Sequence, residues 1–593
     1  MSFTPLDWSI VVAYFVLTAL IGFWFTGKAS ESVSEYFVSG RKVPWWLAGI
    51  SMVATTFAAD TPLAVTGFVA AHGVAGNWIW WNFVMGGVLT VFFFARLWRR
   101  AGVMTDAELA EVRYGGKPAA ILRGFRAMYL ALPINLIIVG WVTAAMIRIL
   151  SIALGIDPLY AVGVCFLFTA AYAVAGGMWA ALWTDVFQFV LKMSAVIILA
   201  VYAVDKVGGI DALRAGVTAH FGTDAALSVL PVHSGFTAYA WMPMLTLATF
   251  LSVQWWAAWY PGAEPGGGGY IAQRIFSAKS EKDGILATLL FQVSHYALRP
   301  WPWIITGLAT IILYPGLTTN TDRENAYIHA FVDLLPTPWR GIMLAGFFAA
   351  YMSTIATQLN WGASYLVNDV YKRFVKPNAP ERELVKVARL ATFGLFILGC
   401  VAAWQIKSVE GAWKFLLALG AGTGLVLILR WYWWRINAWS EISSMIASFV
   451  ISIVAMKVVP GYFPAGDPRI DSVVLLVTAF GSMLVWIPVT FLTQPESDAT
   501  LRSFYERVRP GGPGWERVSS AMGYGREKIP GGALNWTNWI AGVIAVYSSL
   551  FGIGKIVFGE YAAGLGFFAL ATVCFVWIAR NLAQVAPSPE TPG

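Results

Sequence analysis

Hydrophobic runs of about twenty residues follow one another along almost the whole chain, and each is long enough to cross the hydrocarbon core of a bilayer as a helix. The pattern therefore predicts an all-α polytopic membrane protein with about fifteen transmembrane helices. We expect these helices at residues 6–27, 43–71, 77–98, 125–153, 158–176, 180–204, 238–273, 285–314, 340–370, 387–405, 411–434, 439–459, 472–493, 535–556 and 562–583.

Two of the runs contain residues that cannot continue a helix. Residues 254–274 hold two prolines, five glycines and Glu264, and residues 54–62 hold three threonines, Asp60 and Pro62. Hydrocarbon tolerates irregular backbone only where protein buries it or where it lines a cavity. Secondary transporters build their solute and ion sites at such interruptions. The two breaks therefore point to transport.

The breaks also suggest an internal repeat. If the first span is peripheral, the broken spans open two five-helix sets, and an odd number of helices gives the sets opposite orientations. This predicts an inverted repeat. The expected divisions are 1–42 (peripheral helix and first cytoplasmic loop), 43–204 (first repeat), 205–237 (extracellular loop), 238–405 (second repeat), 406–493 (peripheral helices), 494–534 (cytoplasmic linker) and 535–593 (C-terminal helix pair and tail).

Every second loop is rich in lysine and arginine, beginning with the loops after the first and third spans. Basic loops stay in the cytoplasm, so we expect a multi-pass protein of the cell (inner) membrane with its N-terminus outside and its C-terminus in the cytoplasm. The net charge of +8 therefore reflects topology and does not indicate nucleic-acid binding.

Composition narrows the classes of function further. Only 12% of the residues are charged, against about 25% in soluble chains. The five histidines and three cysteines show no metal-binding spacing, which argues against a metalloenzyme. No phosphate-binding Gly-x-x-x-x-Gly-Lys-Ser/Thr loop is present, so we expect no ATP site and no enzyme.

The ninth span carries a polar face. Ala350, Ser353 and Thr354 are spaced i, i+3, i+4 and share one side of a helix. Hydroxyl and carbonyl oxygens together make a neutral site that suits a hard cation. Alternatively, the hydroxyls bond back to their own helix or join two helices.

A resemblance to a known family rests on a series of motifs. These are Ser34–Arg41 with Pro44–Trp46, Gly176–Gln188, Tyr270–Arg274, Ala349–Asn360 and Asn368–Lys372. In their order and sequence they resemble the sodium:solute symporter family, and within it the sodium/galactose symporter branch, over about residues 6–493. The resemblance implies a leucine-transporter-type fold. Its core helices form two inverted five-helix repeats, with the first and sixth core helices broken, and it couples sodium entry to solute uptake.

The resemblance also implies an ion site. Its sodium ligands would be the carbonyls of Ala54, Phe57 and Ala350 and the hydroxyls of Ser353 and Thr354. Asp185 matches a family aspartate near the sodium exit route, although an acid at a helix N-terminus has a purely local explanation. Ala356 removes one hydroxyl of the second sodium site that some members have, so we expect one Na+ per solute.

The chain departs from the sugar-transporting members in the solute pocket. Thr61, Trp80 and Tyr296 stand where those members have a glutamine, a glutamate and a lysine. Galactose is therefore not the expected solute. The candidate solute contacts here are Asp60, Thr61, Trp80 and Tyr296. Tyr270 is a candidate inner gate, with packing on the broken helix as the alternative.

Further candidate contacts lie near the second break. Trp255, Trp256 and Trp259 offer faces that stack on sugars and attract cations, or they pack the helix. Arg299 suits a solute carboxylate, while an ion pair between Arg299 and Glu264 is the structural alternative. The residues alone leave both choices open.

These observations predict a sodium-coupled secondary symporter that imports a small polar organic solute by alternating access, with a sugar or sugar derivative as the first candidate. A carboxylate-bearing solute is the alternative, as is proton coupling through Asp60, Asp185 or Glu264. A membrane sensor is the non-transport alternative, and a channel is disfavoured because no carbonyl-filter motif appears. The expected partners are the solute and the lipid bilayer, without nucleic acid or an obligate protein partner.

Overall fold

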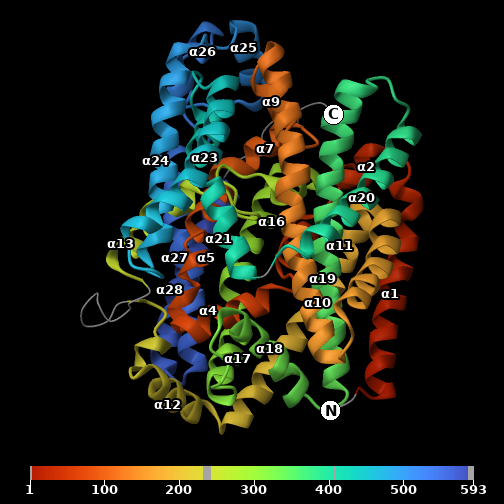
Figure 1. Cartoon of the computed structure of the whole chain (residues 1–593). Coiled ribbons are helices and arrows are strands. Elements are labelled where there is room, and N and C mark those ends of the chain that lie inside the picture. The colour runs from red at the N-terminus through yellow and green to blue at the C-terminus, as the bar shows by residue number, and fades with distance from the viewer. Residues whose placement is uncertain (1–2, 232–241, 407, 585–593) are drawn as a thin grey trace.

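The computed structural model describes residues 3–231, 242–406 and 408–584, and within these ranges every element is helical, without a strand (Figure 1). The predicted all-α class is thus confirmed. The long helices are α1 (Pro5–Ala29), α10 (Asn135–Leu154), α11 (Pro158–Val207), α19 (Trp339–Ser364), α20 (Glu381–Ala403), α23 (Ala438–Val458), α24 (Arg469–Leu492), α27 (Gly532–Val557) and α28 (Tyr561–Gln584). Shorter helices used below are α3 (Trp45–Thr56), α4 (Thr61–His72), α5 (Trp78–Trp81), α9 (Gly116–Tyr129), α14 (Trp255–Ala257), α15 (Gly269–Ser277), α16 (Glu281–Val293), α17 (Pro300–Leu313), α21 (Val409–Gly420), α22 (Gly424–Tyr432), α25 (Asp498–Val508) and α26 (Glu516–Ala521).

Fewer helices cross the molecule uninterrupted than the hydrophobic runs suggest. The described residues contain 10 helices that are long and apolar enough to span a membrane, or up to 12 if each bent pair counts as one span. The expected count of about fifteen also includes the runs 238–273 and 285–314, which are interrupted, and the run 158–176, most of which has no described side chains. Within the run 238–273, the described residues 242–273 are divided among several short helices, and 285–314 divide into α16, a π-helical turn and α17.

The first predicted break is present. Helices α3 and α4 meet at an angle of 59°, and Pro62 stands in the first turn of α4. Proline lacks a backbone N–H and has a fixed φ, so it begins a helix readily but ends the pairing with the preceding turn. The interruption at Phe57–Asp60 leaves carbonyl groups of α3 free to face other ligands.

The second break, between α14 and α15, is covered by another bent helix pair. Helices α21 and α22 meet at 47°, and Trp259 N donates to Gly420 O at 3.1 Å. A Cβ on Gly424 would stand 2.0 Å from Trp256 O, so only glycine permits this close approach. The irregular backbone is therefore buried in protein, as a bilayer requires.

Helix α11 is interrupted at Gly177, where φ is 56° and ψ is −156°. This left-handed value separates the helix into two pieces at the boundary expected between the spans 158–176 and 180–204. Its second piece contacts α3 and α19 through Lys192 and α1 through Gln188, and α1 also packs against α19. It thereby brings residues 180–204 against the first break.

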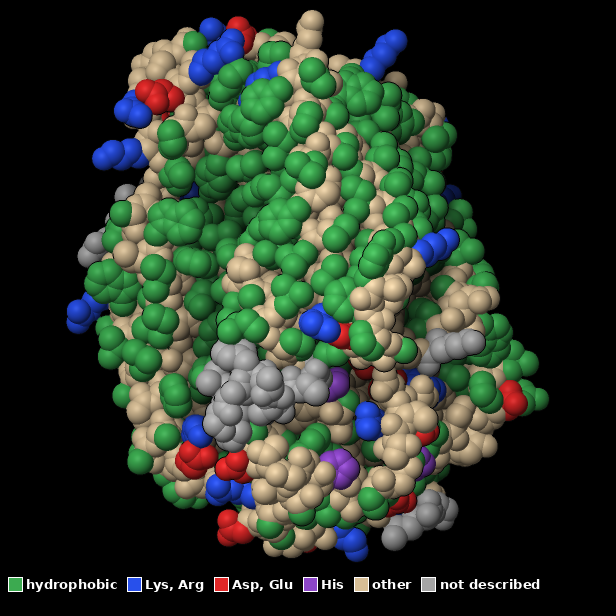
Figure 2. Space-filling model, turned by 60° about the vertical axis from the view of Figure 1, so that its left-hand side comes forward, with side chains coloured by type: hydrophobic (Ala, Val, Ile, Leu, Met, Phe, Trp, Pro, Cys, Tyr) green, Lys and Arg blue, Asp and Glu red, His purple; other side chains and the backbone are tan. Residues whose placement is uncertain are grey.

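The surface agrees with a membrane setting. Figure 2 shows hydrophobic side chains over the middle of one face, with most charged side chains near its two ends. The stretch 494–534 is more ordered than a linker: it contains α25 and α26, and Trp515 Nε1 donates to Trp431 O at 2.8 Å. Its buried aromatic residues attach it to the end of α22.

Candidate functional site

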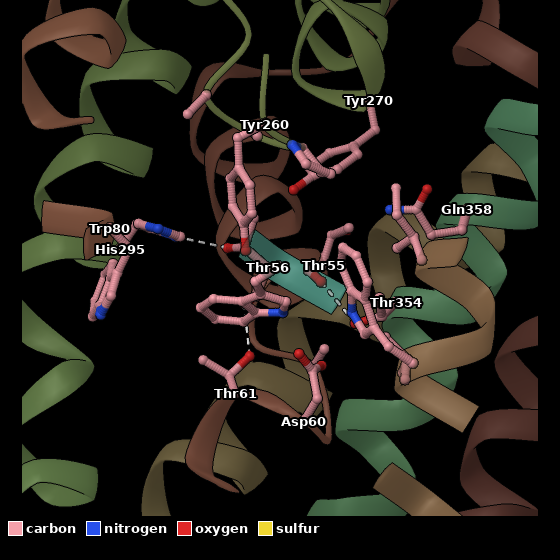
Figure 3. Close-up of a pocket in the computed structure, with 18 of the residues that line it drawn as sticks. Thr55, Thr56, Asp60, Thr61, Trp80, Tyr260, Tyr270, His295, Thr354 and Gln358 are labelled. Atoms are coloured by element: carbon pink, nitrogen blue, oxygen red, sulfur yellow. Dashed lines mark hydrogen bonds between the residues drawn. The ribbon is translucent and has the colours of Figure 1, made fainter. Parts of the chain in front are cut away.

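A cavity of about 640 Å³, which includes space open to solvent, lies between the two breaks. In Figure 3, Tyr260 and Tyr270 point into it from one end, while Asp60 and Thr61 lie at the other. Its lining comes from the α3–α4 break, α5, α10, residues 260–263, α15, residues 295–299, α19 and α21.

The structure brings together six residues that the sequence suggested for the solute pocket or its gate. These are Asp60, Thr61, Trp80, Tyr270, Tyr296 and Arg299. The Trp80 and Tyr296 rings are stacked with centroids 5.7 Å apart, and His295 meets Trp80 edge-on at 5.6 Å. The cavity therefore has one aromatic wall, of the kind that covers an apolar ring face.

Other lining residues were not among the candidates for the solute pocket. His295, Trp141, Trp413 and Gln358 belong to this group. A residue on a helix faces a cavity only at a particular rotation of the helix about its axis. The local sequence pattern does not determine that rotation. The proximity of His295 to Arg299, four residues along one helix, was the available hint.

The tryptophans of the second break do not line the cavity. Trp255 and Trp256 donate their indole N–H groups to Leu251 O and Ser252 O of their own helix, at 3.1 and 2.7 Å. Trp259 lines a neighbouring cavity instead. Their positions match the packing alternative rather than the pocket alternative.

Arg299 and Glu264 do not form the ion pair considered above. Arg299 Nη1 donates to Thr56 Oγ1 at 3.0 Å, and Arg299 Nη2 lies 3.2 Å from His295 Nε2. Glu264 accepts from Gly262 N at 3.1 Å. Arg299 takes part in no salt bridge found among the described residues, so a guanidinium lines the cavity without a carboxylate partner.

The expected sodium ligands do converge. Ser353 Oγ donates to Ala54 O at 3.0 Å, across the interface between α19 and the end of α3. Thr354 Oγ1 donates to Thr55 O at 2.7 Å and to Ala350 O at 3.1 Å. Carbonyl and hydroxyl oxygens of the first break and the ninth predicted span are therefore gathered at one point.

A lysine that the sequence analysis did not select occupies this point. Lys192, on the second piece of α11, places Nζ 2.7 Å from Ala54 O, 3.2 Å from Phe57 O and 3.0 Å from Ser353 Oγ. Its side chain is 1% exposed. The available signal was a lysine within the hydrophobic run 180–204, since an ionisable residue at membrane depth is a functional candidate by default.

A second cation lies beside it. Arg274 Nη2 donates to Thr357 Oγ1 at 2.7 Å and to Ser51 Oγ at 3.2 Å. Ser51 Oγ in turn donates to Asp185 Oδ2 at 2.5 Å. Asp185, the expected sodium-route residue, thus belongs to a buried network that already contains a guanidinium.

Comparison with known proteins places this arrangement in a family. The model of the sodium:solute symporter family matches residues 36–448, more than half of the chain. The chain belongs to the sodium:solute symporter family. It is therefore a sodium-coupled solute transporter rather than an enzyme, as predicted, and a multi-span membrane protein.

Individual relatives of this symporter are distant but cover most of its length. A sodium/glucose cotransporter of Vibrio parahaemolyticus is 24% identical over 501 residues, covering 81% of this chain and 90% of the relative. Sodium/glucose cotransporter 1 of Oryctolagus cuniculus is 25% identical over 501 residues, covering 76% and 72%. The solved substrate-bound outward-open state of a Na+-coupled sialic acid symporter is 21% identical with a TM-score of 0.66, covering 84% of this chain and 99% of that one. The structural likeness confirms the predicted fold.

Proposed function

We propose that this symporter imports a small polar organic solute by alternating access, with a sugar or sugar derivative as the first candidate. The observation that carries the proposal is the cavity between the two broken helices, which adjoins the oxygen cluster of α3 and α19. A solute in the cavity and a cation at the cluster would both contact the first break. One rearrangement of that break can therefore respond to both ligands.

The proposed sodium position is the set of oxygens contributed by Ala54, Phe57, Ala350, Ser353 and Thr354. It consists of neutral donors, as a singly charged hard cation prefers, and Thr354 also lines the solute cavity. Asp185 lies nearby through Ser51 and is the proposed route residue. One Na+ per solute remains the expected ratio, because Arg274 already fills the space beside Thr357.

A carboxylate-bearing solute is the second candidate, and Arg299 favours it. A buried guanidinium that lacks a protein carboxylate can bind one from the solute through two parallel hydrogen bonds. The aromatic wall of Trp80 and Tyr296 suits the apolar face of a sugar ring in either case. A sugar acid would use both groups.

For the topology, we propose a cell-membrane location with the N-terminus outside and the C-terminus in the cytoplasm, supported by the alternation of basic loops. We also propose that the second inverted set extends to Tyr432 rather than ending at 405. The range 238–405 holds only four of the expected spans, so the bent pair α21–α22 would supply the fifth, and it also covers the backbone of the second break.

Uptake by proteoliposomes tests the proposal with a matched pair of solutes. Glucose and glucuronate share a ring and differ by one carboxylate, so glucuronate uptake that Arg299→Gln reduces at least tenfold, with glucose uptake little changed, would assign the carboxylate site. Each solute is offered with an inward sodium gradient, with potassium in its place, and with a proton gradient alone. Uptake driven by protons without sodium would contradict sodium coupling. Absence of uptake or binding for both solutes would contradict the sugar class.

A further inference from the structure

The ammonium of Lys192 has the surroundings that the proposed sodium ion needs. An ammonium offers three N–H donors and accepts no hydrogen bond. Its acceptors here are two carbonyls, Ala54 O and Phe57 O, and one hydroxyl, Ser353 Oγ. All three belong to the proposed sodium ligands, so every acceptor of the lysine is an atom that the ion would use.

The two cations cannot use these oxygens at the same time. A sodium ion bound to Ala54 O, Phe57 O and Ser353 Oγ would stand in the space that Lys192 Nζ now fills, at 2.7 to 3.2 Å from those atoms. Two positive charges at such separation in a buried site repel each other strongly. Binding of one therefore requires the other to leave.

No carboxylate holds Lys192 in place directly. Lys192 forms none of the salt bridges found among the described residues, and the nearest acid on its own helix, Asp185, accepts from Ser51 Oγ. The Phe57 ring adds a weak cation–π contact, with Nζ 5.1 Å from its centroid. The lysine is thus held by the same neutral groups that would hold a free ion, and by its tether to α11.

We propose that Lys192 is a tethered competitor of the transported sodium ion, and that its ammonium and Na+ occupy the same oxygen atoms alternately. This inference rests on the proposed position of the sodium site. It assigns a role to a residue that links α11 to both α3 and α19. When sodium leaves, the lysine restores a cation to the site, so the buried oxygens keep a partner in the sodium-free transporter.

The test measures sodium binding to the purified full-length protein, read as thermal stabilisation in NaCl against KCl at equal ionic strength. Lys192→Met removes the ammonium at similar side-chain length. Lys206→Met, an exposed lysine near the end of the same helix, is the matched control. We expect the sodium concentration for half-maximal stabilisation to fall at least tenfold in Lys192→Met and to stay unchanged in Lys206→Met.

A second substitution locates the effect. In Lys192→Met/Ser353→Ala the gain in sodium affinity is expected to disappear, because a proposed ligand of the ion is gone. If Lys192→Met does not fold, as judged by its elution as a single species, Lys192→Gln keeps an N–H donor and allows the same measurement. An unchanged sodium response in a folded Lys192 variant, or a gain that survives Ser353→Ala, would overturn the proposal.

Uptake measurements on the wild type distinguish a failure of the lysine proposal from a failure of sodium coupling itself. If wild-type uptake ignores sodium while Lys192→Met gains a sodium response, the lysine is the occupant of the site and sodium coupling is contradicted. If wild-type uptake requires sodium while Lys192→Met binds it no better, sodium coupling stands and the competitor is excluded.

Discussion

Lys192 and Arg126 are both buried cations, yet their partners differ in kind. Lys192 contacts two carbonyls and a hydroxyl, whereas Arg126 forms salt bridges of 3.2 Å with each of Asp106 and Glu441. Removing the Lys192 ammonium leaves only neutral oxygens behind. Removing the Arg126 guanidinium leaves two buried carboxylates that have lost a cationic partner. The comparison indicates that one cation is exchangeable and the other is structural.

Arginines near Arg126 also pair with buried or partly buried carboxylates, unlike Lys192. Arg123 pairs with Asp369 at 2.7 Å and with Glu111 at 2.8 Å. Arg430 joins Glu441 at 3.4 Å. These pairs connect α9, the segment after α19 and the α22–α23 region, which lie far apart in the sequence. A network of this kind fixes the relative positions of its elements in one conformation.

The largest expected effect is that of Arg126→Met. Because the substitution leaves Asp106 and Glu441 buried with one cation fewer, we expect a loss of about 3–5 kcal/mol in stability. Thermal unfolding in detergent measures it. The control is Arg469→Met, which removes an exposed arginine that pairs with Asp467 at the surface and is expected to change stability far less. Equal losses for the two variants would remove the structural role assigned to Arg126.

Lys192→Met should cost less than Arg126→Met. Measured in potassium, its loss is expected at about 1–3 kcal/mol, since the acceptors left behind are uncharged and Ser353 Oγ still donates to Ala54 O. The same thermal assay gives both values. A loss as large as that of Arg126→Met would show that Lys192 is as structural as the arginine, and the contrast between the two regions would be lost.

The smallest expected effect is the difference in stability loss between the variants of two neighbouring hydroxyls. Ser353 accepts from the Lys192 ammonium, whereas Thr354 donates to Thr55 O and contacts no charge. In potassium, Ser353→Ala is expected to lower stability by about 1.5–3 kcal/mol and Thr354→Ala by about 0.5–1.5 kcal/mol. In Lys192→Met the two losses should become similar, because neither hydroxyl then meets a cation. A larger loss for Thr354→Ala in the wild type would contradict the contact between Lys192 and Ser353.

Much of this architecture follows from local chemistry. The breaks at residues 57–60 and 258–268 were predicted from proline and glycine, which disrupt helices wherever they stand. The polar face of α19 was predicted from spacing alone, and its hydroxyls do meet the end of α3. Structural features that depend on a few adjacent residues can thus be predicted from the sequence.

The sequence did not predict which side of each helix faces the cavity. Trp255 and Trp256 follow a π-helical turn at Phe250–Gln254, and the extra residue in such a turn rotates every later side chain about the axis. The separation of Glu264 from Arg299 likewise depends on the path of the irregular backbone. Lys192 could have been predicted, because a lysine within the hydrophobic run 180–204 is an ionisable residue at membrane depth.

The contact between the second break and the bent pair α21–α22 has a mechanical consequence. Because Gly420 and Gly424 bring α21–α22 against the backbone of Trp256 and Trp259, neither this pair nor the second break can shift alone without breaking the hydrogen bond from Trp259 N to Gly420 O or opening a gap that nothing fills. The second break and the pair α21–α22 must therefore move together. Trp515 and α25 both contact Trp431 of α22. A displacement beside the central cavity is therefore transmitted through α22 to the polar end of the molecule.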